Sequence, residues 1–309
     1  MELEALTGLL RRLERPEGPV DVVLDTDAYN EVDDQFAISY LLASQDRLRI
    51  KALYAAPFFN ERSSGPKDGM EKSYQESLRL LRLAGFPQLE GSVFRGSDSY
   101  LPDESTPVRS PAAEDLAKRA MAYSPENPLY VAAIGAPTNV ASALLLEPAI
   151  AQRVVIVWLG GHAWDWPDNR EFNAFQDVAA DRVIFDSQAA VVQLPCQGVV
   201  SAFRVSGPEL RQYLLGKSPL CDYLVTLVEE SQKAEQAGPC WTRVIWDVTT
   251  VGWLLGRRFM EDRLEPSPIF QYDHHYSFDK SRHPMRYVYH IHRDELFADL
   301  FEKLTRLGK

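Results

Sequence analysis

The stretch VDVVLDTDAYNEVDDQFAISYLLAS, residues 20–44, contains the pattern that decides the fold. Residues 20–25 are a short apolar run rich in valine, which predicts a buried β-strand. Residues 31–44 carry apolar side chains at helical spacing and predict an α-helix. A strand that passes through a short acidic loop into a helix is the first part of a β-α-β unit, in which the next strand lies parallel to the first.

The same alternation of strand and helix patterns continues along the chain. Further strands are expected over 48–56, 129–135, 153–161 and 286–292, and further helices over 68–84, 112–123, the stretch after Pro137, 208–237, 246–256 and the C-terminal segment. Continuous apolar runs such as 153–161 are typical of parallel strands buried on both faces. We therefore expect an α/β fold, with a mostly parallel open sheet, helices on both faces, and a single domain over residues 1–309.

The composition excludes several classes of partner. The chain has 309 residues, and its net charge of −11 argues against nucleic acid and anionic membranes as partners. The sequence contains no run of 18 apolar residues, so no transmembrane helix is expected. Residues 1–18 predict a short amphipathic helix and not a signal peptide. The three cysteines are scattered and predict neither a disulfide framework nor a CxxC metal pair, so we expect a cytoplasmic protein.

Four aspartates lie within ten residues where the first strand leads into the first long helix, namely Asp25, Asp27, Asp33 and Asp34. Carboxylates packed this closely repel one another, so some are protonated or a cation lies among them. An all-oxygen set without nearby cysteine or histidine favours a hard ion, Ca²⁺ or Mg²⁺. In open α/β sheets, ligands bind at the carboxyl ends of the strands, which is where these residues are predicted to lie.

A structural role is the alternative for part of this cluster. Asn30 could cap the helix while Asp33 closes a capping box, and acidic residues in a first helical turn interact favourably with the helix dipole. This alternative accounts for Asp33 and Asp34 but not for Asp25 and Asp27 at the end of the strand.

The segment VVLDTDAYNEVDDQFAI resembles the N-terminal motif of the nucleoside hydrolases, in which Asp-x-Asp is followed by Asp-Asp at the start of a helix. The resemblance implies their Rossmann-like fold, with Asp27 and Asp34 as calcium ligands and Asp27 also activating the attacking water. It implies that Asp33 hydrogen-bonds the ribose and that Asp25 supports the loop. The loop from Ala28 to Val32 is two residues longer than is usual in the family and lacks its glycine.

Two further segments resemble the family's remaining metal-binding segments. In IGAPTNVASAL (134–144), the resemblance implies that the backbone carbonyl of Thr138 binds the metal, although Thr138 could instead cap a helix that begins at Pro137. In VIWDVTTVGWLL (244–255), it implies that Asp247 is the last ligand, and a helix N-cap is the alternative. Trp246 stands where many members have a histidine thought to assist the leaving base, and an indole N–H cannot act as an acid.

The segment GGHAWDWPDNREFNAFQD (160–177) resembles the family segment that ends in Glu-Phe-Asn, which implies ribose contacts for Glu171 and Asn173. In an extended chain both side chains face the same way, and a carboxylate beside an amide suits adjacent hydroxyls. Both residues could equally be ordinary polar residues of a loop. Asp165 or Asn169 is expected to take the place of a further ribose-binding asparagine.

Less specific matches complete the candidate substrate site. Asn60 corresponds approximately to an asparagine near the second strand of the family. His162 and the adjacent His274 and His275 are candidates for a substitute acid. The tryptophans Trp164 and Trp166 could stack on a base or belong to the core.

Together these segments predict a metal-dependent hydrolase that cleaves the N-glycosidic bond of ribonucleosides to give ribose and free base, in purine or pyrimidine salvage. No GxxxxGK[ST] loop is found, so a nucleoside is favoured over a nucleotide. One alternative is a nucleoside-binding protein that keeps the metal site without turnover, which Trp246 favours. The other is a metal-dependent phosphohydrolase, although no phosphate-binding lysine motif is evident. The resemblance also implies a homodimer or homotetramer.

Overall fold

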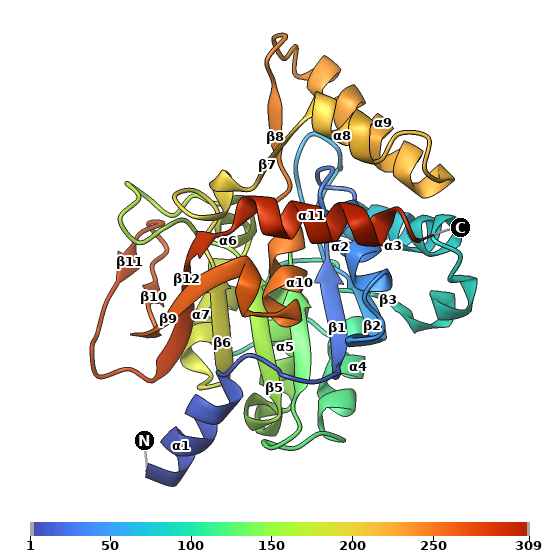
Figure 1. Cartoon of the computed structure of the whole chain (residues 1–309). Helices are drawn as coiled ribbons and strands as arrows, with labels where there is room; N and C mark the ends of the chain where they lie inside the picture. Colours follow the sequence, from blue (N-terminus) through green and yellow to red (C-terminus); the bar gives the residue numbers. More distant parts are fainter. Residues whose placement is uncertain (1–2, 308–309) are drawn as a thin grey trace.

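The computed structural model describes residues 3–307 and has an eight-stranded sheet at its centre, with the strand order β3-β2-β1-β4-β5-β6-β12-β9 (Figure 1). All neighbouring strands pair in parallel except β12 and β9, which pair antiparallel at one edge. The expected α/β class with a mostly parallel sheet is therefore confirmed.

The strands of this sheet are short. They are β1 (Val20–Thr26), β2 (Leu48–Ala55), β3 (Val93–Arg95), β4 (Leu129–Ala133), β5 (Val154–Leu159), β6 (Ala190–Leu194), β9 (Met260–Pro266) and β12 (Pro284–Ile291). Two small antiparallel pairs join β7 (Arg204–Ser206) to β8 (Thr242–Val244) and β10 (Ile269–Phe270) to β11 (Tyr276–Ser277).

Eleven α-helices surround the sheet in the part of the chain that the structure describes. They are α1 (Leu3–Arg12), α2 (Asp34–Leu42), α3 (Pro66–Leu83), α4 (Pro111–Ala120), α5 (Thr138–Leu146), α6 (Phe172–Gln176), α7 (Val178–Asp186), α8 (Gly207–Tyr213), α9 (Pro219–Ala234), α10 (Val248–Leu255) and α11 (Arg293–Leu304). Short 3-10 helices cover Pro87–Ser92, Pro148–Gln152, Val200–Ala202 and Arg257–Phe259. Within residues 3–307, no helix combines the length and the apolar character needed to cross a membrane.

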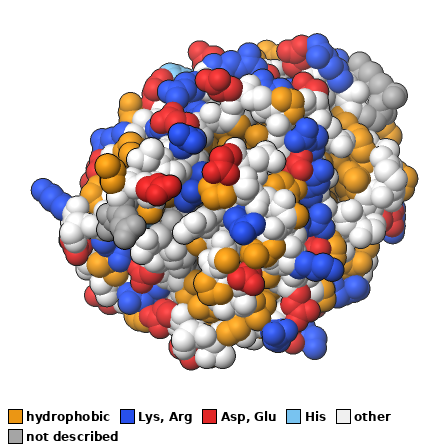
Figure 2. Space-filling view, turned by 90° about the horizontal axis from the view of Figure 1, so that it is seen from below, with side chains coloured by type: hydrophobic (Ala, Val, Ile, Leu, Met, Phe, Trp, Pro, Cys, Tyr) orange, Lys and Arg blue, Asp and Glu red, His pale blue; other side chains and the backbone are white. Residues whose placement is uncertain are grey.

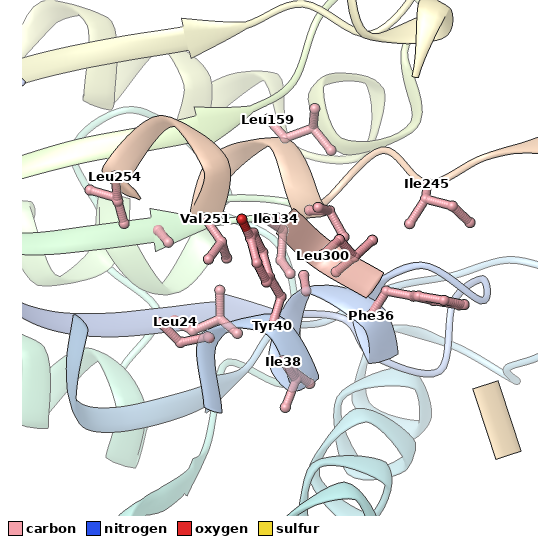
Figure 3. Close-up of a cluster of buried hydrophobic side chains, with 14 of the residues drawn as sticks. Leu24, Phe36, Ile38, Tyr40, Ile134, Leu159, Ile245, Val251, Leu254 and Leu300 are labelled. Carbon is pink, nitrogen blue, oxygen red and sulfur yellow. The ribbon is translucent and has the colours of Figure 1, made fainter. Parts of the chain in front are cut away.

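Alternate residues of β1 enter two separate hydrophobic cores, as expected for a strand covered on both faces. Val22 and Leu24 pack into the core beneath α2, α10 and α11, and Figure 3 shows Leu24 in that core beside Tyr40 and Val251. Val23 packs into the second core, beneath α4, α5 and α7. Both cores hold β1 in the middle of the sheet, so the position of its carboxyl end is fixed.

The predicted elements were found within a few residues of their expected positions, with some omissions. The sequence analysis missed β3, β6, β9, α6, α7 and the small strand pairs. The strand β9 has the sequence MEDRLEP and pairs only with β12 at the sheet edge, so it shows no apolar run.

On the face seen in Figure 2, acidic and basic side chains lie next to one another among apolar ones.

A buried ion-pair network joins the segment after α1 to the edge strand β9. The carboxylate of Asp262 accepts hydrogen bonds from Arg15 Nε at 2.9 Å, Arg286 Nη1 at 2.6 Å and Trp253 Nε1 at 2.9 Å. The side chains of Arg15 and Asp262 are only 5% and 6% exposed. Burial by itself raises the pKa of Asp262, but these partners outweigh burial and hold the pKa below its usual value.

We expect Asp262→Ala to lower the free energy of unfolding by about 3–5 kcal/mol, because it leaves two buried guanidinium groups without their shared carboxylate. Urea denaturation measures this change. The matched control is Glu302→Ala, which removes the exposed partner of Arg306 and should change stability by less than about 1 kcal/mol. Equal effects of the two substitutions would show that the buried network does not hold β9 in place.

Candidate active site

The carboxyl ends of β1, β4 and β5 meet at one edge of the sheet, beside a cavity of about 290 Å³. The lining residues are Asp27, Asn30, Glu31, Asp33, Asp34, Ile134, Leu159, His162, Arg170, Glu171, Phe172, Asn173, Cys196, Gln197, Trp246 and Asp247. A larger hollow of about 740 Å³ lies over α8 and α11, but it has no comparable cluster of buried carboxylates. The smaller cavity is therefore the candidate active site.

Buried carboxylates from three segments converge at the inner end of this cavity. Asp27 follows β1, Asp33 and Asp34 begin α2, and Asp247 precedes α10. Asp33, Asp34 and Asp247 each offer a carboxylate oxygen within 4.8 Å of the others. Burial and the neighbouring carboxylates raise the pKa of Asp247 well above its usual value, and burial with repulsion from Glu31 raises the pKa of Asp33 to about 7.

Asp27 differs from the other carboxylates because neither of its oxygens has a hydrogen-bond partner among the described residues, although the side chain is 1% exposed. Burial, and then repulsion from Asp34 and Asp33, raises the pKa of Asp27 well above its usual value. Gly135 makes room for this side chain, since a Cβ at residue 135 would lie 3.0 Å from Asp27 Cγ. A buried carboxylate without a partner is costly, so the pocket favours a proton or a cation at this point.

The donor set fits a hard divalent cation. All the candidate ligand atoms are oxygens, and hard ions such as Ca²⁺ bind oxygens at about 2.3–2.6 Å, so ligands of one ion lie up to about 5 Å apart. The three clustered carboxylates lie within this span. The unpartnered oxygens of Asp27 beside them are acceptors that such an ion would satisfy. The cluster could therefore hold a metal ion.

The structure does not support the capping roles considered for the acidic residues. The helix α2 begins at Asp34 with Asp33 at the N-cap position, so the expected capping box between Asn30 and Asp33 is wrong. The longer loop explains the difference, because Asn30 N donates to Asp27 O at 2.7 Å and closes a turn before the helix. Asp33 instead accepts a hydrogen bond from the backbone N–H of Trp246 at 3.0 Å.

Thr138 and Asp247 occupy the starts of α5 and α10 without capping them. Pro137 holds the N-cap position of α5, and the Thr138 hydroxyl donates to Asp177 Oδ2 at 2.6 Å, so the alternative that Thr138 caps this helix is wrong. Asp247 lies at the N-cap position of α10, but its side chain makes no capping hydrogen bond. Its carboxylate belongs to the acidic cluster. The proposed ligation by the Thr138 carbonyl stays a prediction.

Glu171 and Asn173 also line the cavity. Glu171 is the N-cap of α6, and its carboxylate accepts from the backbone N–H groups of Asn173 at 3.1 Å, Ala174 at 3.1 Å and Gly161 at 2.9 Å. Asn173 Nδ2 donates to Leu159 O at 3.0 Å. The expected extended geometry is wrong, because Asn173 lies in the first turn of a helix, but both side chains still line the cavity.

Two other predicted residues, His162 and Trp246, also line the cavity, whereas Asn60 and Asp165 do not. Asn60 supports the wall, since its Nδ2 donates to Asn30 Oδ1 at 2.6 Å. Asp165 is exposed. Of the pair Asp165 and Asn169, the structure buries only Asn169, which accepts from the His162 N–H at 2.7 Å and so supports the loop.

The remaining aromatic and histidine candidates lie outside the lining. Trp164 is partly buried against the second core and packs on Tyr287 with ring centroids 4.3 Å apart, whereas Trp166 is 45% exposed and meets the His162 ring edge-on at 6.0 Å. His274 packs against Phe175 with centroids 5.3 Å apart.

The sequence analysis missed several lining residues. Cys196 and Gln197 follow β6, a strand that was not predicted, so no pattern indicated them. Arg170 lies next to Glu171 in the chain, and its position beside a predicted site residue was the one indication available. Glu31 was treated only as part of a helix, although it lines the cavity and pairs with Arg243 at 2.5 Å.

Sequence comparison relates the chain to a single enzyme family. A family model described as inosine-uridine preferring nucleoside hydrolase matches residues 22–295. The pyrimidine-specific ribonucleoside hydrolase RihA of Citrobacter koseri is 26% identical over 248 residues, 72% of this chain and 76% of that protein. The protein of the same name from Salmonella agona is 25% identical over 259 residues, 76% of this chain and 79% of that protein.

Solved structures show the same fold at lower sequence identity. A purine-preferring ribonucleoside hydrolase from Gardnerella vaginalis superimposes with a TM-score of 0.76 at 18% identity, covering 94% of this chain and 99% of that one. A plant nucleoside hydrolase gives a TM-score of 0.73 at 20% identity, covering 93% and 99%.

We expect a divalent cation to raise the melting temperature, because it binds the folded carboxylate cluster and not the unfolded chain. Calcium at about 100 times its Kd should add about 2.7 kcal/mol of stability. Asp34→Asn should remove most of this gain and weaken calcium binding in calorimetry. The control is Glu76→Gln, at a buried carboxylate outside the cavity, which should keep the gain. An Asp34→Asn protein that binds calcium as tightly as the parent would contradict the metal assignment.

Proposed function

This chain belongs to the inosine-uridine preferring nucleoside hydrolase family, and from that premise we propose that it hydrolyses the N-glycosidic bond of ribonucleosides to ribose and free base with the help of a calcium ion. The observation that carries the proposal is a single cavity that is lined both by the acidic cluster and by Glu171 and Asn173. The clustered aspartates suit a metal ion and a water, and the side chains of Glu171 and Asn173 suit the hydroxyls of a sugar.

The proposed ion is held by the carboxylates of Asp27, Asp34 and Asp247 and the backbone carbonyl of Thr138, with magnesium as the alternative metal. The unpartnered oxygens of Asp27 support this assignment. When bound, the ion supplies positive charge that orients sugar hydroxyls and lowers the pKa of a water. Asp33 also belongs to the cluster, but it is engaged by the Trp246 N–H, so we assign it to the ribose. If Asp33→Asn abolished calcium binding, Asp33 would be assigned as a metal ligand instead.

The sugar is proposed to lie between Asp33 on one side and Glu171 and Asn173 on the other. Glu171 is held rigidly by three backbone N–H groups, and Asn173 is held by Leu159 through one of its two amide hydrogens. Asn173 therefore keeps its carbonyl oxygen and a second N–H for a ligand, and Glu171 keeps acceptor capacity. This pairing of acceptors and a donor suits adjacent ribose hydroxyls, and the rigid backbone contacts hold the side chains in place before substrate enters.

Asp27 is the proposed general base. Neither of its carboxylate oxygens accepts a hydrogen bond from the described residues, so one oxygen can hold the ion while the other takes a proton from the attacking water. As the bond to the base breaks, positive charge develops at the ribosyl carbon. The surrounding carboxylates, fixed before the reaction, stabilise that charge.

The names of the curated relatives guide the choice of substrate. They are called pyrimidine-specific ribonucleoside hydrolases, which makes uridine and cytidine the first nucleosides to test. The family membership also supports three further proposals: that the chain acts as one domain, that it assembles into a homodimer or homotetramer, and that it serves base salvage in the cytoplasm.

The direct test is incubation with a panel of uridine, cytidine, inosine and adenosine in the presence of calcium, followed by an assay for reducing sugar. Ribose release is expected for the parent protein, and Asp27→Asn should lower the rate by about 10²–10⁴-fold because it removes the general base. Nucleoside binding without ribose release would favour a binding protein, the alternative suggested by Trp246. Phosphate release from a phosphomonoester in place of ribose release would favour a phosphohydrolase.

We expect Asn173→Ala to lower kcat/KM for a nucleoside. The loss should correspond to about 1–3 kcal/mol of transition-state stabilisation, the cost of a lost hydrogen bond to the sugar. Glu171→Ala should lower kcat/KM similarly, with an added loss of stability of about 0.5–2 kcal/mol because Glu171 also caps α6. The control is Asn127→Ala, at an exposed asparagine outside the cavity. Unchanged kinetics in both site variants would remove these residues from the sugar site.

A further inference from the structure

Arg170 is the one lysine or arginine among the cavity-lining residues of the described chain. It lies between the buried Asn169 and Glu171 in the loop that joins β5 to α6, and its own side chain is exposed. Its backbone N–H donates to Asp168 Oδ1 at 2.9 Å. Its guanidinium forms neither an ion pair nor a hydrogen bond with any residue from 3 to 307, so its positive charge is free to meet a ligand.

Other arginines near the cavity are engaged, and Arg62 donates to the backbone carbonyl of the lining residue Glu31 at 3.1 Å. Arg243 pairs with Glu31 at 2.5 Å and with Glu235 at 2.8 Å, and it does not line the cavity. Arg170 thus keeps an unused charge beside a cavity rich in carboxylates, where a guanidinium would ordinarily find an acidic partner. A planar guanidinium offers several N–H donors to a flat anion and stays charged at all ordinary pH values.

The proposed reaction generates a negative charge on the departing base. When the bond from the ribosyl carbon to the base nitrogen breaks, the electron pair stays on the base. Trp246 carries an indole N–H that cannot serve as an acid. Burial lowers the pKa of His162, and its Nδ1 accepts from the Gln197 N–H at 3.4 Å, so both features disfavour the charged ring. Arg170 is therefore the lining side chain that carries a permanent positive charge to offset the charge on the base.

We propose that Arg170 stabilises the negative charge that develops on the leaving base, so that the base departs as an anion against the guanidinium. This inference rests on the proposed function. The water oxygen bonds to the ribosyl carbon and its proton passes to Asp27, while the base anion takes a proton from solvent after it leaves. The products are ribose and neutral base, and no further reactant is needed.

Charge also favours the leaving base over a substrate phosphate as the partner of Arg170. A phosphate dianion would be repelled on entry by the carboxylates that line the cavity. A neutral nucleoside meets no such repulsion, and its negative charge appears only as the bond breaks. The guanidinium then binds the transition state more strongly than the substrate, which is the condition for raising kcat.

The test compares Arg170→Ala and Arg170→Lys with the parent on two substrates, uridine and p-nitrophenyl riboside. Arg170→Ala should lower kcat for uridine by about 10²-fold, the usual effect of removing one such stabilising group, with a much smaller change in KM. The effect on p-nitrophenyl riboside should be far smaller, because p-nitrophenolate is already a stable anion. Arg170→Lys should recover part of the loss because it keeps the charge. The control is Arg82→Ala, at an exposed arginine that pairs with Glu90.

An equal loss of kcat on both substrates would overturn the proposal, because it would indicate a structural role for Arg170. A change in KM for uridine 5′-monophosphate alone, with uridine kinetics unchanged, would also overturn it and assign the guanidinium to a phosphate. If the parent turns over uridine and Arg170→Ala does so equally well, the inference fails while the proposed function stands. If the parent releases ribose from neither substrate, the proposed function fails and this inference fails with it.

Discussion

The mutual repulsion of carboxylates buried at one point is the constraint on which the rest of this structure depends. Asp27, Asp34 and Asp247 are each 4% exposed or less, and burial together with neighbouring charge raises the pKa of each. Such a cluster is stable only if protons or a cation offset the charge, or if the scaffold holds the groups together against their repulsion. The location of the site and its preference for a cation both follow from this arrangement.

The scaffold provides that restraint from several directions. The strand β1 lies between β2 and β4, with hydrophobic cores on both faces, so its carboxyl end cannot move away from the cluster. The first turn of α2 and the segment before α10 are joined by the hydrogen bond from the Trp246 N–H to Asp33. Helix α10 also packs against α2 in the core that Figure 3 shows. Part of the free energy gained by packing the core thus offsets the repulsion between the carboxylates.

The resulting cavity carries both negative and positive side chains. Clustered carboxylates line it, and the loop between β5 and α6 contributes the guanidinium of Arg170, which is unpaired within the part of the chain that the structure describes. In the proposed reaction, positive charge develops on the sugar and negative charge on the base, so such a cavity can stabilise both partners of one bond as it breaks. Fixed charges of this kind require no rearrangement during the reaction.

The sequence by itself determined the α/β class, the central strands and the acidic cluster, because apolar runs, helical spacing and the Asp-rich segment are local patterns. It also indicated Asp247, Glu171 and Asn173, through resemblance to a family. Only the tertiary structure decided that Asp33 contacts Trp246 instead of capping a helix, that Glu171 caps α6, and that Arg170 has no acidic partner among residues 3–307. Each of these depends on residues far apart in the chain or on the path of a loop, which local patterns do not encode.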